Sequence, residues 1–251
     1  MKISIITITY NSQHTVEDTI QSVTSQDYDD IEYIIVDGMS KDSTLKIVDK
    51  YRHRIAKVIS EKDNGLYDAL NKGIKAATGD VVGLLHSDDM YSDKSVISNI
   101  ARIFANSAKP DAVYADLVFV SRSDTEKVMR IWKSGEYREG AFLKGWMPPH
   151  PTFFVKRNCY ERFGYFNTNL KLSADYELML RFIHKNHIRI SYLPQTIVKM
   201  RMGGTSNVSF FVKLKANLED KIAWRLNGIK PGALTVLKKP FSKIGQFLRF
   251  G

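Results

Sequence analysis

The sequence predicts an α/β fold built on a doubly wound, mostly parallel sheet. Over the first ninety residues, apolar strand-like runs alternate with segments whose apolar residues recur at helical spacing. The runs are short and end in polar turn residues, which is typical of parallel strands covered on both faces. Right-handed helical crossovers join such strands. With 251 residues, 43% of them hydrophobic, the chain can bury a core of this kind.

The expected elements of the first half alternate strictly. We expect strands at 2–9, 31–36, 56–60 and 81–85, and helices at 14–25, 44–52 and 66–77. The first strand is rich in β-branched residues. The first helix carries Val16, Ile20 and Val23 on one face. Gly79 lies where the third helix is expected to end.

After residue 90 the alternation breaks. We expect a helix up to about 106, a hairpin of strands at 111–120 and 127–132, a strand at 152–155 followed by a turn at 156–158, a helix at 174–185, strands at 188–193 and 196–200, and a helix at 209–226. The prolines within 147–151 remove N–H donors and restrict their neighbours, so we expect no regular structure there. We divide the chain into one domain over 1–207, with halves 1–90 and 91–207, and a basic helical extension over 208–251.

The net charge of +10 is concentrated near the end of the chain. From Lys213 onward the sequence has nine Lys or Arg against two acids. A nucleic-acid-binding domain would spread its charge more evenly, so we expect no nucleic-acid partner. Residues 233–250 alternate apolar and basic side chains. This pattern predicts either an amphipathic helix at an anionic membrane surface or a helix packed on the domain with a solvated basic face.

Several classes of protein are disfavoured by what the sequence lacks. The single cysteine, Cys159, excludes an internal disulfide, and no apolar run approaches the ~20 residues of a membrane span. The start of the chain does not have the pattern of a signal peptide. These features fit a cytoplasmic location. The dinucleotide fingerprint, the P-loop and the His-Glu-x-x-His zinc motif are all absent.

Polar residues follow the ends of successive expected strands. Thr9 and Asn11 follow the first strand, Asp37 the second, and Asp88 and Asp89 the fourth. Ligands of open α/β sheets bind beyond the carboxyl ends of the strands, so these side chains are expected to converge. Neighbouring acids that both stay ionised usually bind a cation, and Mg²⁺ or Mn²⁺ suits carboxylates. The alternative is a solvated Ser-Asp-Asp turn that caps the next helix.

Two further positions allow a functional and an ordinary interpretation. Asp175 lies in the first turn of an expected helix, whose dipole favours an ionised carboxylate by about 0.3–1 kcal/mol. It is either a general base or a simple helix cap. Arg201 precedes two glycines in a turn that either closes over a phosphate or is an ordinary turn.

Taken together, residues 2–206 resemble the family 2 glycosyltransferases of the GT-A fold. The motifs are Ile-Thr-Tyr-Asn-Ser, Ile-Ile-Val-Asp-Gly-Met-Ser-Lys-Asp-Ser-Thr, Glu-Lys-Asp-Asn-Gly-Leu-Tyr-Asp-Ala-Leu-Asn-Lys-Gly-Ile, Ala-Thr-Gly-Asp, His-Ser-Asp-Asp and Ser-Ala-Asp-Tyr-Glu-Leu. The family more often has Asn where His86 stands and Glu where Ala174 stands. The resemblance implies a mostly parallel sheet with a smaller mixed sheet and C-terminal helices.

The resemblance also implies roles for individual residues. Asp37 would hold the nucleobase, and Asp175 would be the catalytic base. Asp88 would face the ribose and the metal, and Asp89 would ligate Mn²⁺ or Mg²⁺. The other implied donor-side residues are Thr9, Asn11, Lys62, Asp68 and Arg201. His150 lies in a segment that resembles the acceptor side of related chains, where it either contacts acceptor or diphosphate or is structural.

The implied activity is metal-dependent, inverting sugar transfer from a UDP- or GDP-sugar to a hydroxyl of a glycan or lipid-linked acceptor. The usual setting of such relatives is surface-polysaccharide or glycolipid assembly, here in the cytoplasm or peripherally on the inner face of the cell membrane. The Gln-x-x-Arg-Trp motif of processive synthases is absent, which favours single additions. The alternatives are a sugar-1-phosphate nucleotidyltransferase and a non-catalytic basic protein that binds membrane or nucleic acid.

Overall fold

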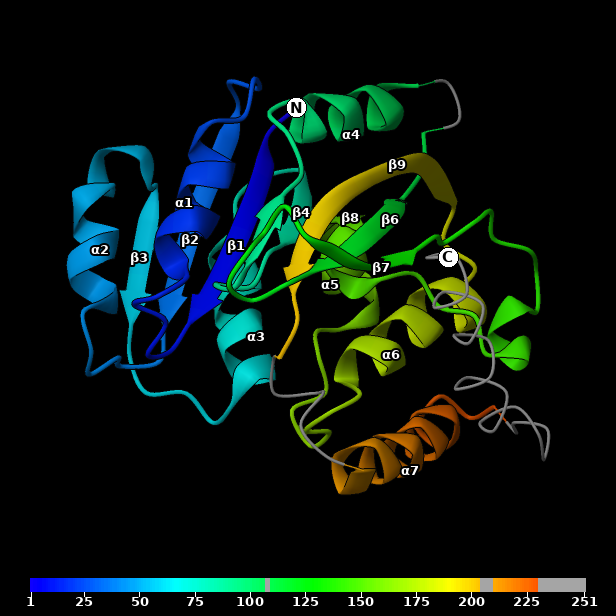
Figure 1. Ribbon diagram of the computed structural model, residues 1–251. Coiled ribbons are helices and arrows are strands. Elements are labelled where there is room, and N and C mark those ends of the chain that lie inside the picture. The colour runs from blue at the N-terminus through cyan, green and yellow to red at the C-terminus, as the bar shows by residue number, and fades with distance from the viewer. Residues whose placement is uncertain (107–108, 204–209, 230–251) are drawn as a thin grey trace.

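The computed structural model describes residues 1–106, 109–203 and 210–229 (Figure 1). Its strands are β1 (Ile3–Thr9), β2 (Ile31–Asp37), β3 (Lys57–Ser60), β4 (Val81–Leu84), β5 (Asp89–Tyr91), β6 (Ala112–Val120), β7 (Val128–Trp132), β8 (Phe154–Lys156) and β9 (Ile190–Arg201). Its α-helices are α1 (Val16–Thr24), α2 (Thr44–Lys50), α3 (Leu66–Ala76), α4 (Val96–Ala105), α5 (Arg157–Phe163), α6 (Ala174–Met179) and α7 (Phe210–Leu226). Short 3₁₀ turns lie at Arg52–Arg54, Ala141–Lys144 and His150–Thr152, and a π-helix follows α6 at Leu180–Lys185.

The first half is the predicted parallel layer. Strand β1 pairs in parallel with β2 and β4, and β2 pairs in parallel with β3. Side chains alternate along β1, so Ile3 and Ile5 pack under α1 and α4, whereas Ile6 and Ile8 pack under α3. Both faces of the sheet are therefore buried, which explains why its strands are continuous apolar runs. The helices of this half lie within a few residues of their predicted bounds.

The second half makes the sheet mixed. Within the described residues nine strands form one sheet in the order β3-β2-β1-β4-β8-β6-β9-β5, with β7 paired to β6. Strand β8 is antiparallel to β4 and β6, whereas β9 is parallel to β6. The smaller mixed sheet that the family resemblance implies is thus continuous with the parallel one. The hairpin of β6 and β7 is confirmed.

Three local predictions from the sequence were wrong, and one strand was missed. The expected strands at 188–193 and 196–200 are one strand, β9, because the register shifts opposite Asp116 and leaves Pro194 outside the ladder. The expected turn at 156–158 instead begins α5. The proline-rich segment contains a 3₁₀ turn, since a proline in the first turn of a helix needs no N–H donor. The strand β5 was not expected at all, because three residues carry too short a pattern.

The C-terminal helix α7 lies against α6 at one side of the molecule (Figure 1). The helix predicted at 233–250 and the glycine turn after residue 203 lie outside the described residues. The proposed domain boundary at 207 stays a prediction. Over the described residues, no helix combines the length and the apolar character needed to cross a bilayer.

Candidate active site

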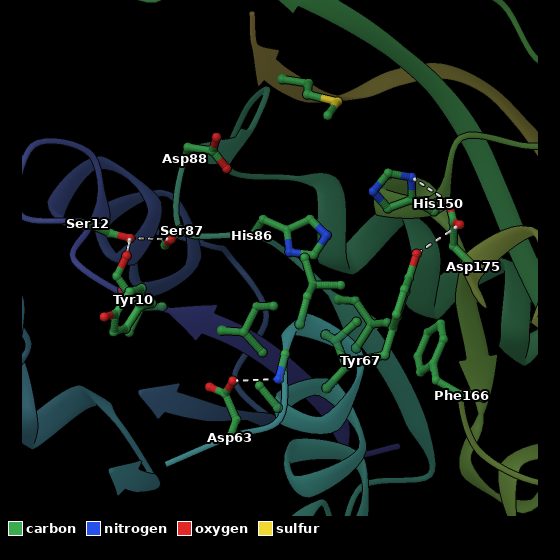
Figure 2. A pocket seen from close by; sticks show the side chains of 18 of the residues that line it. Tyr10, Ser12, Asp63, Tyr67, His86, Ser87, Asp88, His150, Phe166 and Asp175 are labelled. Carbon is green, nitrogen blue, oxygen red and sulfur yellow. Dashed lines mark hydrogen bonds and ion pairs between the residues drawn. The ribbon is translucent and has the colours of Figure 1, made fainter. Parts of the chain in front are cut away.

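One cavity of about 630 Å³ opens at the carboxyl ends of β1 and β4 (Figure 2). This size is within the usual range of small-molecule sites, roughly 300–1,000 Å³. Polar side chains from distant parts of the chain line it: Thr9, Asn11, Asp63, His86, Asp88, His150 and Asp175. The expectation that strand ends converge is therefore met for the loops after β1 and β4. Figure 2 shows Asp88 on one side of this cavity and Asp175 on the other.

The loop 86–89, called here the acid loop, is held by hydrogen bonds from the neighbouring segment 12–19. The Thr19 hydroxyl on α1 donates to the Asp89 carbonyl at 2.7 Å. The Ser12 and Ser87 hydroxyls share a hydrogen bond of 2.9 Å. These contacts fix the backbone, so the Asp88 side chain enters the cavity from a rigid base.

Asp89 lies below this surface, and its side chain is fully buried. Among the described residues, neither of its carboxylate oxygens has a hydrogen-bond partner of good geometry. Burial and the neighbouring charge of Asp88 raise the pKa of Asp89 well above its usual range, although Arg201 opposes this. A buried carboxylate without donors lacks the compensation that a cation would supply, so the Asp88–Asp89 pair fits a divalent ion.

The protein side chains alone do not complete a metal site. No cluster of three or more His, Cys, Asp or Glu side chains suited to a metal occurs among the described residues. A magnesium-like ion commonly takes one or two carboxylates and completes its shell with substrate phosphates and water. The pair is therefore compatible with an ion that binds together with a diphosphate.

Arg201 does not face the cavity as a phosphate-binding side chain, which corrects the expectation for it. Its side chain is 4% exposed, and its guanidinium donates to the Asp88 carbonyl at 3.1 Å and pairs with Asp18. The residue ends β9, so this contact ties β9 to the acid loop and α1. Arg201 thus positions Asp88 from behind.

The residues after β1 and β2 form a linked pair of loops. The Thr9 hydroxyl is buried at the cavity wall, and no residue of the described ranges forms a hydrogen bond with it. Asn11 adopts a left-handed backbone (φ 50°), and its side-chain oxygen accepts the Lys41 N–H at 2.8 Å. Asp37 is fully buried and accepts hydrogen bonds from the Ser40 N–H and hydroxyl and from the Ser60 hydroxyl. Unlike Thr9 and Asn11, Asp37 does not line the cavity.

The resemblance implies that the loop 61–64, with Tyr67 and Asp68, borders the donor, and only part of this set reaches the cavity. Lys62 is exposed, and neither it nor Asp68 lines the cavity. Asp68 accepts the Asn64 N–H at 2.9 Å and lies 3.7 Å from the Lys72 ammonium group. Asp63 and Tyr67 line the cavity in their place. The motif located the loop correctly, whereas the direction of each side chain is set by the turn at Gly65.

Asp175 lies in the first turn of α6, at the cavity wall. The Tyr67 hydroxyl donates to one carboxylate oxygen at 3.3 Å, and His150 Nδ1 lies 3.4 Å from the other (Figure 2). The Tyr67 ring is stacked on Phe166 at 5.5 Å, which fixes the hydroxyl. Both oxygens therefore have an oriented neighbour, and the carboxylate is held facing the cavity.

The two histidines of the cavity contact one another. The rings of His86 and His150 are 5.5 Å apart in an edge-to-face arrangement. Burial and the proximity of His150 lower the pKa of His86 to about 3, against the opposing effect of Asp175. His86 is therefore neutral near pH 7, so it presents an uncharged imidazole between the two acids.

Helix α7 holds the segment that leads into Asp175, which the sequence did not indicate. The buried Glu219 carboxylate accepts the backbone N–H groups of Lys171, Leu172 and Ser173 at 2.8–3.2 Å. Further along α7, the Trp224 indole donates to the Tyr176 hydroxyl at 3.0 Å. No local sequence signal links residues that lie more than forty positions apart.

Comparisons with known proteins show what the chain as a whole is similar to. The model of glycosyl transferase family 2 matches residues 4–167. Two Mycobacterium tuberculosis H37Rv proteins are similar over most of the chain. "Uncharacterized glycosyltransferase Rv1514c" is 28% identical over 71% of this chain and 68% of its own. "PGL/p-HBAD biosynthesis glycosyltransferase Rv2957" is 25% identical over 81% and 78%.

Solved structures share the fold. S. aureus TarS 1-349 in complex with UDP-GlcNAc has a TM-score of 0.70 at 21% identity, over 90% of this chain and 65% of that chain. The mannosyltransferase PcManGT from Pyrobaculum calidifontis, in complex with GDP-Man and Mn²⁺, has a TM-score of 0.68 at 19% identity, over 98% and 70%. These likenesses confirm the predicted fold class.

Proposed function

Because this chain belongs to glycosyl transferase family 2, it is a glycosyltransferase, and we propose that it transfers a sugar from a nucleoside-diphosphate donor to an acceptor hydroxyl with inversion. The observation that carries this proposal is the single cavity lined by both Asp88 and Asp175. One acid lies at the strand end where an α/β sheet binds ligands. The other is a carboxylate oriented by Tyr67 and His150.

The donor is assigned to the side of the cavity formed by the loops after β1 and β4. Thr9, Asn11 and Asp88 line this side, and Asp37 supports it from behind. Titles of the similar structures name UDP-GlcNAc and GDP-Man as their ligands, which supports a UDP- or GDP-sugar. Lys62 and Asp68 are assigned only to shaping the loop beside it, because neither side chain lines the cavity.

Asp88 and Asp89 are the residues that would hold a divalent cation, Mn²⁺ or Mg²⁺. The buried oxygens of Asp89, which have no hydrogen-bond partner of good geometry in the described part of the chain, support this assignment, as does the Mn²⁺ named with PcManGT. When bound, such an ion offsets the negative charge that develops on the departing diphosphate. The protein's own contribution is to keep the acid loop rigid through Thr19 and Arg201.

Asp175 is assigned as the general base. The acceptor oxygen forms a bond to the anomeric carbon as the bond from that carbon to the diphosphate oxygen breaks, and the acceptor proton passes to the Asp175 carboxylate. One displacement inverts the anomeric configuration. His150 and Tyr67 orient the carboxylate, and His150 also borders the space left for the acceptor. The name of the Rv2957 relative supports glycolipid assembly as the setting.

The test is a panel of UDP- and GDP-sugars incubated with the protein, with and without Mn²⁺, while nucleotide release is followed. We expect nucleoside diphosphate release from at least one donor. A nucleotidyltransferase would instead release pyrophosphate from a nucleoside triphosphate and a sugar 1-phosphate. Pyrophosphate release, or binding of no nucleotide sugar at all, would overturn the proposal.

A further inference from the structure

The outward face of α7 carries a stripe of exposed apolar side chains. Leu218, Ile222 and Leu226 are 53%, 43% and 53% exposed. Their spacing of four residues puts them on one side of the helix. Large apolar side chains that recur on an outward helix face are a mark of an interaction surface.

The opposite face of α7 packs against the rest of the protein. Glu219, Ala223, Trp224 and Asn227 are all buried. Asn227 donates to Glu177 on α6 at 3.0 Å, in addition to the contacts of Glu219 and Trp224. Helix α7 lies against α6 (Figure 1), and its buried contacts to α6 fix its orientation, so the exposed apolar stripe lies on the side away from these contacts.

The charges beside the stripe have one sign. Lys215, Lys221 and Arg225 are exposed. The two acids within residues 215–226, Glu219 and Asp220, are buried on the inner face. In this described part of α7 the outward face thus combines three apolar side chains with three cations and no anion.

We propose that this outward face of α7 docks on an anionic lipid bilayer. An apolar stripe flanked by Lys and Arg is the arrangement that lies in a membrane interface, with the cations near lipid phosphates. The sequence that follows, 230–251, adds five Lys or Arg and no acid. A second copy of α7 and the chain's own segment 230–251 are the two other candidates for covering this face. Both are basic, so binding of either one would place cations against cations.

The proposed docking surface belongs to a helix that directly contacts the helix carrying Asp175. The Trp224–Tyr176 hydrogen bond joins α7 to α6, and Asp175 lies in the first turn of α6. On the proposed transferase function, docking holds the acceptor side of the cavity near acceptors carried on lipid. The docking itself does not depend on that function, since it is measured without donor or acceptor.

The test is sedimentation of the full chain with phosphatidylcholine vesicles that contain or lack phosphatidylglycerol. One variant, Leu218→Gln/Ile222→Gln/Leu226→Gln, removes the stripe, and a second, Lys221→Gln/Arg225→Gln, removes two flanking cations. We expect wild-type protein to bind only the anionic vesicles. The stripe variant should partition on the order of a hundredfold more weakly. The cation variant should partition roughly twenty-fivefold more weakly, because each of the two cations contributes about fivefold.

The control is Val128→Gln/Met129→Gln, two exposed apolar residues of β7 that should leave binding unchanged. Melting temperatures and nucleotide calorimetry of every variant show that the fold and the donor site are intact, so a failure of the transferase proposal is seen separately. If the stripe variant bound the anionic vesicles as strongly as the wild-type protein does, the proposal would be overturned. A concentration-dependent dimer that is lost in the stripe variant while vesicle binding stays unchanged would overturn it as well.

Discussion

Replacing Glu219 with alanine should destabilise the protein and slow transfer, because this side chain is the support of the loop that leads to Asp175. Its carboxylate accepts three backbone N–H groups at 2.8–3.2 Å, and the residue is 7% exposed. Removing it leaves three backbone donors without their acceptor, of which the Ser173 N–H is buried and the other two are partly buried. Each unsatisfied group costs about 1–3 kcal/mol, so we expect a loss of roughly 3–5 kcal/mol in the free energy of unfolding.

Urea denaturation measures this loss, with Glu161→Ala as the matched control. Glu161 is an exposed acid in an i,i+4 ion pair with Arg157 on α5, and such pairs contribute about 0.3–0.5 kcal/mol. A displaced loop also moves Asp175, so kcat should fall by up to about a hundredfold while nucleotide binding persists. An unfolding free energy for Glu219→Ala that equals that of Glu161→Ala would refute the reasoning, because the three hydrogen bonds would then contribute nothing.

Three further outcomes are expected. Burial alone would raise the pKa of Glu32, but hydrogen bonds from Ser4 and Thr78 lower it to about 2. The ionised carboxylate therefore stabilises the folded protein fully above pH ~4.5, and this contribution is lost as the pH falls toward 2. The stability difference between wild type and Glu32→Gln, followed by urea melts across this range, should therefore shrink with acid; a difference that grows would contradict the assignment. Gly73→Ala would place a Cβ in steric conflict with the side chain of the buried Ile6, and thermal melts should show a loss of about 1–3 kcal/mol in the free energy of unfolding through overpacking. In Asp175→Asn, transfer should fall by roughly 10²–10⁴-fold while calorimetry shows unchanged donor binding; equal loss of both would mean that the residue binds the donor.

The parallel layer could be predicted from the sequence because its determinants are local. The strand β1 is a run of β-branched residues, and α3 repeats its apolar residues at helical spacing up to Ile74, although it ends at Ala76 and not at Gly79. The position of Asp88 followed from the abrupt end of β4. In these cases the period of the pattern, the turn residues and the burial of both faces all indicate the same structure.

The remaining features depend on long-range packing, which no local pattern encodes. The strand β5 exists because Asp89–Tyr91 pairs with β9 about 110 positions later. The sequence placed Arg201 in a phosphate-binding turn, whereas its partners are Asp18 and the Asp88 carbonyl. Glu219 could not be identified, since its partners are backbone N–H groups, which have no sequence signature.

The most direct measurement is a crystal structure of the protein with a UDP- or GDP-sugar and Mn²⁺. We predict that the diphosphate lies at the acid loop, with the metal about 2.0–2.2 Å from a carboxylate oxygen of Asp88 or Asp89. The anomeric carbon should face Asp175 across a gap that admits one acceptor hydroxyl. A nucleotide bound outside this cavity, or an anomeric carbon turned away from Asp175, would contradict the assignment of donor and base to this site.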